Sequence, residues 1–373
     1  MKNVFVLLSS LGSGGAERVA VGLANAWAQR SMQVTLMPTH SNFDGSSFYA
    51  IDERVNVRPL VEPGRTGRVG EKYWGFFARL YRLRRLLVRA RADVVVAFLP
   101  NVNIATILAT TGTGIPSVVG ERSDPSIQPM GAFWRFACWA LYRFANALTV
   151  QTSAVARKIP STFGGVRRIE VMPNPLPAGL LAHEHRPDRD AQRRVLLSLG
   201  RLAPEKQVGQ IIDVFSRLAV EHADWDLHVY GEGTLEAQLR DQVAALGLQE
   251  RVSFKGPTRQ PWLAMEDADL FVMNSRFEGF PNALLEAMGV GLPCVAADCP
   301  SGPREISREG QDALLFAPDD LDTMRRHLHT LMDDIAARER LGRQARTSVS
   351  QRYSLESVLA RWDSLLSTVA SQR

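Results

Sequence analysis

One stretch decides the fold: Asn274-Ser-Arg-Phe-Glu278-Gly-Phe-Pro-Asn282-Ala-Leu-Leu-Glu286. The apolar run 270–273 before it predicts a buried strand, and the apolar spacing after Pro281 predicts a helix over about 282–288. A strand, a tight turn and a helix start bring several unpaired backbone N–H groups to one point. That arrangement favours a bound phosphate.

Two carboxylates flank this turn, because Glu278 lies within it and Glu286 follows about one helical turn inside the helix. A carboxylate beside a phosphate is unfavourable unless it accepts hydrogen bonds, and sugar and ribose hydroxyls donate them. The stretch therefore predicts a sugar-nucleotide site. An ordinary strand-to-helix turn with two solvated glutamates explains the same spacing equally well.

Length and composition indicate the number of domains, the class of partner and the compartment. The 373 residues exceed one ordinary core, which favours two domains. A net charge of +5 and a pI near 9.3 favour a polyanionic partner: phosphates, a membrane face or nucleic acid. Three cysteines without metal spacing indicate a reducing compartment. No apolar run reaches the roughly 18 residues typical of a membrane span.

The N-terminal part reads as a strand over 4–9, a glycine loop with Gly14 and Gly15, and a helix over about 16–30. This combination lets a phosphate approach a helix N-terminus, although simple turn geometry also explains the glycines. The third glycine of the dinucleotide fingerprint is missing. No acidic residue ends the second strand, 33–37, which disfavours a dehydrogenase.

A basic, aromatic segment follows at 72–91. Its apolar residues Phe76, Leu80, Leu83 and Leu87 fall on one helical face. The other face is basic. It is either a solvated surface or a binding site for anionic lipid headgroups or a pyrophosphate-linked acceptor. The arginines of this face are Arg79, Arg82, Arg85 and Arg89.

Polar residues end two further strands of the first half. Asn101 and Asn103 follow the strand 93–98, and Glu121 and Arg122 follow the strand 117–120. In an open α/β sheet, ligands bind at this end of the strands, although a solvated loop remains an alternative. The aromatic helix 130–146 is expected to be mostly core, with membrane contact as a second possibility. Strands at 148–151 and 169–172 complete the first sheet.

The second half begins after a proline- and charge-rich segment, 173–194, which is interpreted as an interdomain linker. Arg201 and Lys206 follow the strand 195–200, and two cations five residues apart in one loop can both reach a pyrophosphate. Further strands are expected at 226–230, 252–255, 270–273, 293–297 and 313–316, with helices over 319–373.

Six short motifs are spaced along nearly the whole chain: Gly14-Gly15-Ala-Glu-Arg18, Glu121-Arg-Ser-Asp-Pro125, Pro173-Asn-Pro175, Gly200-Arg-Leu-x-x-Glu-Lys206, Gly231-x-Gly233 and Glu278-x7-Glu286. In this order they resemble the motifs of the family 4 retaining glycosyltransferases. The resemblance implies an α/β protein of the GT-B fold, with two Rossmann-like domains facing each other across a cleft. Residues 1–175 would bind the acceptor, and residues 176–354 the nucleotide sugar. A helix at about 355–373 would pack back on the first domain.

The resemblance also implies residue roles. Arg201 and Lys206 would hold the donor diphosphate and stabilise the leaving group in place of a metal, and Glu278 would contact the transferred sugar. Glu121 and Arg122 stand where many relatives carry a histidine, so the acceptor contact is a departure from the pattern. The implied donor-binding residues are Gly14, Gly15, Lys255, Gly256, Gly279, Phe280, Pro281, Asn282, Ala283 and Glu286; the acceptor-binding ones are Asn103, Glu121, Arg122, Arg82 and Arg85.

The implied function is retaining transfer of an N-acetylhexosamine or hexose from a UDP-sugar. The acceptor would be a polyprenyl-diphosphate-linked or other cell-envelope glycan. No metal, other cofactor or nucleic acid is expected. The protein would be a cytoplasmic monomer or weak dimer on the inner face of the plasma membrane. A GT-B sugar-nucleotide epimerase and a non-catalytic glycan-binding membrane partner remain as alternatives.

Overall fold

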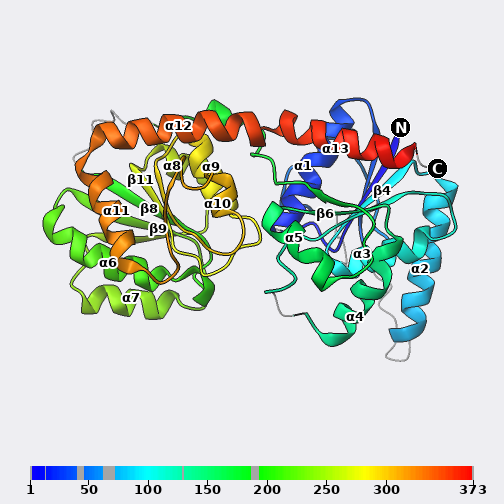
Figure 1. Ribbon diagram of the computed structural model, residues 1–373, viewed down its shortest axis with the longest axis horizontal. Coiled ribbons are helices and arrows are strands. Elements are labelled where there is room, and N and C mark those ends of the chain that lie inside the picture. Colours follow the sequence, from blue (N-terminus) through cyan, green and yellow to red (C-terminus); the bar gives the residue numbers. More distant parts are fainter. Residues whose placement is uncertain are drawn as a thin grey trace. The chain divides into compact units, whose positions relative to one another are not determined.

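The computed structural model describes residues 2–12, 14–39, 46–61, 72–127, 130–185 and 193–371. The chain divides into two compact units (Figure 1). Unit 1 comprises Met1–Asn174 and Glu356–Arg373, and unit 2 comprises Pro175–Leu355. The last helix of the chain therefore belongs to the same unit as the first strand.

Unit 1 is built on a parallel sheet with the described strands in the order β3-β2-β1-β4-β5-β6-β7. Apart from the link between β2 and β3, where the described residues form no helix, the connections are helical, as is usual between parallel neighbours. The strands are β1 (Asn3–Leu8), β2 (Gln33–Pro38), β3 (Asn56–Val57), β4 (Val94–Phe98), β5 (Ser117–Gly120), β6 (Ala147–Val150) and β7 (Ile169–Val171). The helices are α1 (Gly15–Gln29), α2 (Lys72–Arg89), α3 (Pro100–Thr110), α4 (Ala132–Leu141), α5 (Ser153–Thr162) and α13 (Leu355–Ala370), with a 3-10 turn η2 (Tyr142–Phe144).

Unit 2 has a second parallel sheet, in the order β10-β9-β8-β11-β12-β13. Its strands are β8 (Arg194–Leu199), β9 (Trp225–Tyr230), β10 (Val252–Gly256), β11 (Leu270–Met273), β12 (Cys294–Ala297) and β13 (Leu314–Phe316). Its helices are α6 (Val208–Glu221), α7 (Glu236–Ala245), α8 (Pro261–Glu266), α9 (Asn282–Val290), α10 (Pro303–Ile306), α11 (Leu321–Asp333) and α12 (Ile335–Tyr353), with the 3-10 turns η3 (Leu180–Ala182) and η4 (Pro204–Lys206).

Both faces of the second sheet are covered, and β11 shows why its sequence is continuously apolar. Leu270 and Val272 join a core cluster with α6 and α11, whereas Phe271 and Met273 join another with α9. Strands buried on both faces need apolar residues at every position rather than at alternate ones. The predicted α/β fold class with two such sheets is confirmed.

The aromatic segment 130–146 contradicts its prediction, because most of it is not core. Within α4 Cys138 is buried, but Phe133 is 72% exposed and Phe136 is 65% exposed. Apolar composition measures what a side chain gains from leaving water. It does not reveal whether protein or another apolar phase covers the side chain.

The segment expected to be an interdomain linker is partly a packed element of unit 2. Leu176 and Leu180 are buried in the core cluster that contains α9, and the backbone N–H of His185 donates to the carbonyl of Val290 at 2.8 Å. The chain passes between the units at Asn174–Pro175 and again at Leu355–Glu356. The remainder of the expected linker, 186–192, lies outside the described residues.

The last helix, α13, packs on unit 1 beside α1 (Figure 1). Trp362 is fully buried, with its ring edge-on to Trp27 and Phe98 at centroid distances of 6.1 Å. The indole N–H of Trp27 donates to Asp363 at 3.0 Å. Among the described residues, no helix has the length and apolar character needed to cross a bilayer.

Candidate active site

The candidate site of unit 2 lies at the carboxyl edge of its sheet. The strand order reverses between β8 and β11, which are neighbours in the middle of the sheet. Loops that leave two such strands diverge, and ligands of open α/β sheets bind in the resulting crevice. The loop after β8 carries Arg201 and Lys206, and the loop after β11 carries Glu278 and the start of α9.

Lys206 and Glu278 meet at this point. The Lys206 ammonium lies 2.6 Å from Oε1 of Glu278, and the two side chains are 20% and 12% exposed. The same loops are also joined through the backbone, since the N–H of Arg276 donates to the carbonyl of Glu205 at 2.8 Å. A cation and a carboxylate 72 residues apart are therefore brought together at the centre of the edge.

Arg201 lies in the same loop but not in this ion pair. Its guanidinium pairs with Glu205 at 2.8 Å, and its side chain is 76% exposed. An exposed arginine with one surface partner can change rotamer at little energetic cost. The loop after β8 thus carries one cation held in an ion pair, Lys206, and one that can move, Arg201.

The N-terminus of α9 directly follows the turn that contains Glu278. Its N-cap, Pro281, makes no side-chain capping hydrogen bond, and the N–H of Asn282 donates to the carbonyl of Phe280 at 2.9 Å. An anion can therefore be bound by the N–H groups that follow in the first turn. The turn before the helix is fixed from behind, because Ser301 donates to the carbonyl of Gly279 at 3.1 Å. Glu286, in the second turn of α9, is only 2% exposed. Asn282 and Ala283 begin the helix, and Phe280 is buried beneath it.

Gly231 and Gly233 determine how the loop after β9 packs on the loop after β8. A Cβ atom at Gly231 would collide with the carbonyl oxygen of Gly200, and one at Gly233 with that of Leu202. Gly231 also donates its N–H to the carbonyl of Gly256 at 2.9 Å. The glycines hold three neighbouring loops in close contact, a structural role that sequence reasoning did not assign to them.

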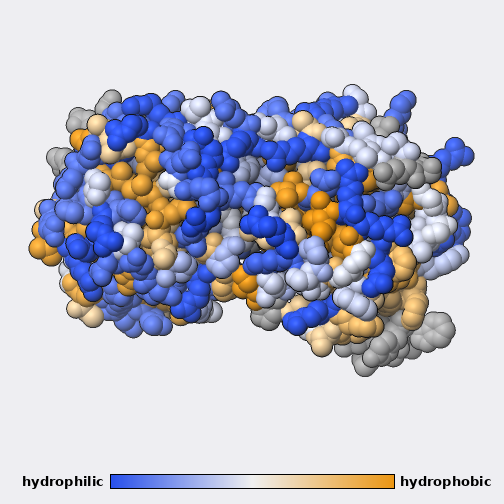
Figure 2. All heavy atoms as spheres, in the orientation of Figure 1, coloured by the Kyte–Doolittle hydropathy of each residue, from blue (hydrophilic) through white to orange (hydrophobic). Residues whose placement is uncertain are grey.

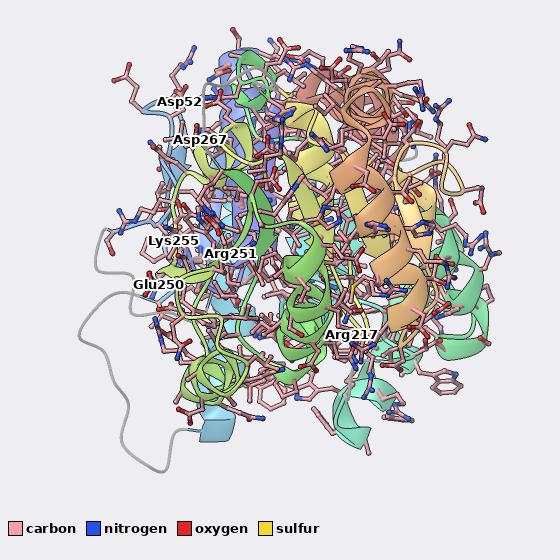
Figure 3. The ribbon with its side chains drawn as sticks, turned by 90° about the vertical axis from the view of Figure 1, so that its left-hand side faces the viewer. Asp52, Arg217, Glu250, Arg251, Lys255 and Asp267 are labelled. Atoms are coloured by element: carbon pink, nitrogen blue, oxygen red, sulfur yellow. The ribbon has the colours of Figure 1, made fainter. Side chains whose placement is uncertain are left out.

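Lys255 and Gly256 end β10, the edge strand two positions from β8. Lys255 is exposed, and Figure 3 shows it on the same side of the unit as Glu250 and Arg251. The described contacts do not bring Lys255 to the Lys206–Glu278 pair.

Two polar groups of the β11 loop were not predicted as site residues. The side-chain oxygens of Asn274 and Ser275 are buried and have no hydrogen-bond partner among the described residues. The amide nitrogen of Asn274 donates to Gln210 at 2.8 Å, so its oxygen has a fixed direction. Buried acceptors of this kind are uncommon, and a bound ligand can satisfy them. Their polar side chains directly after an apolar strand were the feature of the sequence that could have identified them as site residues.

In unit 1, Gly14 and Gly15 stand at the N-terminus of α1, with Gly14 as the N-cap. Glu17 folds back over this end, and a Cβ atom at Gly14 would collide with its carboxylate. Ser10 donates to the Glu17 carboxylate at 3.0 Å. An acidic side chain thus already lies at the helix end where the sequence suggested a phosphate.

A buried polar chain follows β5. The amide nitrogen of Asn103 donates to the carbonyl of Gly120 at 3.0 Å and to the Tyr142 hydroxyl at 3.2 Å. The Tyr142 hydroxyl in turn donates to Glu121, whose side chain is buried. Burial raises the pKa of Glu121 to about 7, although the hydrogen bond from Tyr142 opposes the shift. Glu121 therefore titrates near neutral pH.

Arg122 lies next to this chain and forms no ion pair with any residue that the structure describes. Its three guanidinium nitrogens are buried without a hydrogen-bond partner among the described residues, and its guanidinium lies 4.7 Å from the centre of the Phe98 ring. Burial lowers the pKa of Arg122 to about 9. Asp124 does not compensate it, because that carboxylate pairs with Lys158 at 2.6 Å. An unpaired buried guanidinium is a ready anion site.

Arg82 and Arg85 lie on α2, which packs on the sheet through the fully buried Leu83 and Leu87. Arg85 is exposed and Arg82 is half-buried. The buried face of α2 is apolar, as predicted, but its exposed face mixes arginines with the apolar side chains of Phe77, Tyr81 and Val88.

Within the described chain, Glu221, His222 and His329 form a group that could hold a metal ion. Nε2 of His222 lies 2.8 Å from Nδ1 of His329. Since His222 precedes β9, the group lies at the amino edge of the sheet, opposite the loops described above. No sequence pattern connects these two histidines, which are 107 residues apart.

Comparisons with known proteins agree with this architecture. A model described as Glycosyltransferase Family 4 matches residues 13–178, and one described as Glycosyl transferases group 1 matches residues 183–348. A Streptomyces coelicolor protein named exopolysaccharide phosphotransferase is 27% identical over 400 residues, with 100% of this chain and 41% of that protein covered.

A second relative matches over nearly its whole length. It is the Campylobacter jejuni GalNAc-alpha-(1->4)-GalNAc-alpha-(1->3)-diNAcBac-PP-undecaprenol alpha-1,4-N-acetyl-D-galactosaminyltransferase, 27% identical over 377 residues and covered to 99% in both chains. Among solved structures, Anabaena HepE in complex with UDP has a TM-score of 0.80 at 19% identity, with 99% of this chain and 100% of that chain covered. From the two matched domains and the two parallel sheets, the chain belongs to the glycosyltransferases of the GT-B fold, with a family 4 domain followed by a group 1 domain.

Proposed function

We propose that this glycosyltransferase moves a sugar, an N-acetylhexosamine or a hexose, from a UDP-sugar to a lipid-linked or other glycan acceptor of the bacterial cell envelope. The observation that carries the proposal is the half-buried Lys206–Glu278 pair at the reversal of the strand order. The Campylobacter relative is named for an undecaprenol-linked glycan, and the HepE structure holds UDP. Both names support this choice of acceptor and donor.

In the proposed mechanism the diphosphate of the donor binds Lys206, Arg201 and backbone N–H groups in the first turn of α9. These groups stabilise the negative charge that develops on the leaving diphosphate, which is the task a metal performs in other transferases. Glu278, released from part of its pairing with Lys206, accepts hydrogen bonds from the transferred sugar, and Glu286 accepts them from the ribose.

The transfer proceeds with retention in this proposal. The acceptor hydroxyl attacks the anomeric carbon on the face that the diphosphate leaves, the bond to the diphosphate oxygen breaks, and the leaving phosphate takes the hydroxyl proton. The chain then needs no nucleophile of its own. Cys299, whose thiol is close enough to feel the charges of Glu278 and Lys206, is poorly suited to that role, because burial raises its pKa to about 12.

Unit 1 binds the acceptor in this proposal, through the polar groups that follow β4 and β5. The uncompensated Arg122 suits an anionic group of the acceptor, and Asn103 and Glu121 lie beside it. The arginines of α2, including Arg82 and Arg85, suit the inner face of the plasma membrane, where the protein would associate peripherally as a monomer or weak dimer.

The test is transfer by the purified protein from a panel of UDP-sugars, with a chelator present. Wild-type protein should transfer or slowly hydrolyse one donor, and Lys206→Ala should reduce the rate about 100- to 1000-fold, as expected for removal of a fixed charge at the leaving group. Arg240→Ala is the matched control, because Arg240 pairs with Glu236 on the surface of α7.

Three results would contradict the proposal: an unchanged rate in Lys206→Ala, loss of all activity with the chelator, or no calorimetric affinity for UDP. The last result would favour a non-catalytic glycan-binding protein. An epimer formed from the UDP-sugar alone would favour a sugar-nucleotide epimerase instead.

A further inference from the structure

Helix α4 exposes an unusual amount of aromatic surface. Phe133 is 72% exposed, Phe136 is 65% exposed and Trp139 is 46% exposed, and Phe144 of η2 adds a fourth ring at 57%. The rings of Phe136 and Trp139 stack on each other at 6.0 Å. Contiguous exposed apolar side chains of this size mark a surface that binds something apolar. In Figure 2 hydrophobic colouring is visible over the lower right of the molecule, the region where Figure 1 places α4.

A groove continues this surface between α2, α3 and α4. It has a volume of about 480 Å³ and is almost entirely apolar. Phe77, which is 65% exposed, contributes to its rim from α2, and Phe133 and Trp134 contribute from α4. The deeper lining includes Leu83 and Ile104. Aromatic side chains therefore surround the opening of the groove of α2, α3 and α4, and core residues form its inner end.

The two segments that form the aromatic rim of the groove carry charges of one sign. Neither 72–92 nor 125–146 contains an aspartate or glutamate, whereas α2 and the α4 segment contain several arginines. A second copy of this chain would place arginine against arginine, and a protein helix would need acidic residues of its own. An anionic bilayer supplies hydrocarbon and negative charge together. The arginines of α2 are Arg79, Arg82, Arg84, Arg85 and Arg89, and those of 125–146 are Arg135 and Arg143.

We infer that α4 is the membrane-inserting element of unit 1 and that the groove of α2, α3 and α4 takes one hydrocarbon chain of an anionic bilayer lipid. The aromatic side chains of α4 then lie at the boundary between headgroups and acyl chains, where tryptophan is enriched and where interfacial helices bury tryptophan and phenylalanine. The arginines of α2 contact the phosphates above them. The inference rests on the proposed function, because a lipid-linked acceptor requires a protein held at this depth.

The experiment measures binding to vesicles of phosphatidylcholine with phosphatidylglycerol by co-sedimentation. The double variant Phe133→Ser/Phe136→Ser should bind at least about tenfold more weakly. It lacks two large apolar side chains that would move from water into the bilayer on binding. Both side chains are exposed, so the fold should be retained. Val220→Ser, at a site 82% exposed on α6 of unit 2, is the matched control and should bind like wild type.

A second measurement addresses the groove itself. Lipids brominated on their acyl chains should quench tryptophan fluorescence, and Trp134→Phe/Trp139→Phe should remove most of that quenching. Ala105→Phe, which fills the groove from α3, should weaken vesicle binding without abolishing it. Arg82→Gln/Arg85→Gln should weaken binding only when phosphatidylglycerol is present.

Unchanged co-sedimentation of the Phe133/Phe136 variant, or no quenching, would overturn the inference. A wild-type dimer that this variant dissociates, seen by light scattering, would assign the surface to a second copy instead. Failure of the proposed function has a different signature: vesicle binding would persist while UDP binding and sugar transfer were absent.

Discussion

At the scale of single residues, unit 1 contains two ionisable groups in unusual environments, Glu121 and Arg122, and they differ in how they are satisfied. Glu121 is buried but accepts a hydrogen bond from Tyr142. The guanidinium of Arg122 is buried over the Phe98 ring without a hydrogen-bond partner among the described residues. A fold that keeps an uncompensated guanidinium loses stability unless a ligand restores it. That makes Arg122 the residue at which acceptor binding should increase stability most.

The pH dependence of unfolding tests the environment of Glu121. Its pKa is raised to about 7 in the folded protein, so between pH about 4.5 and 7 the folded state binds more protons than the unfolded state. The contribution of Glu121 is present at low pH and is lost as the pH rises through 7. The free energy of unfolding should fall by about 3 kcal/mol more in wild type than in Glu121→Gln between pH 5 and 8. Urea unfolding at both pH values measures this, and parallel pH profiles would exclude it.

At the scale of elements, the apolar runs predicted the strands, and the strand-loop-helix order predicted the parallel sheets. A strand such as 270–273 is recognisable because burial on both faces leaves no polar position. The exposed α4 could not be predicted in this way, because the same apolar residues serve a core or a membrane. The orphan oxygens of Asn274 and Ser275 also needed coordinates, since only three-dimensional packing reveals which polar atoms lack partners.

The packing of the site loops gives a prediction at this scale. Gly231 has a φ of 138°, and a Cβ there would collide with the carbonyl of Gly200. Gly231→Ala should destabilise the protein by more than about 2 kcal/mol and weaken UDP binding, because the loop that carries Arg201 must move.

Gly247→Ala separates the cost of a strained backbone from the cost of a collision. Gly247 has a positive φ of 68°, but a Cβ atom there would meet open space. It should show only the cost of the strained backbone, about 1 kcal/mol, with normal UDP binding. Equal effects of the two substitutions on UDP calorimetry would show that the collision with Gly200 is unimportant.

At the scale of the whole molecule, the chain passes between the units twice, so the last helix stabilises the first unit. The family resemblance carried by six ordered motifs predicted a fold of two Rossmann-like domains. The contact between His222 and His329 could not be predicted from the sequence, because contacts over such sequence distances follow from the assembled sheet.

Trp362 tests this arrangement, because a residue from the end of the chain fills the core of the unit that begins it. Its side chain is fully buried against Trp27 and Phe98. Trp362→Ala should therefore destabilise unit 1 by about 3–5 kcal/mol through the cavity it leaves. Hydrogen exchange should accelerate in β1 and β4, whereas β8, β11 and the calorimetric affinity for UDP in unit 2 should change little. Arg361→Ala, at an exposed neighbouring position, is the control and should leave both units unchanged. Accelerated exchange throughout unit 2 in Trp362→Ala would mean that the two units unfold as one cooperative body, and the division of roles between them would then need revision.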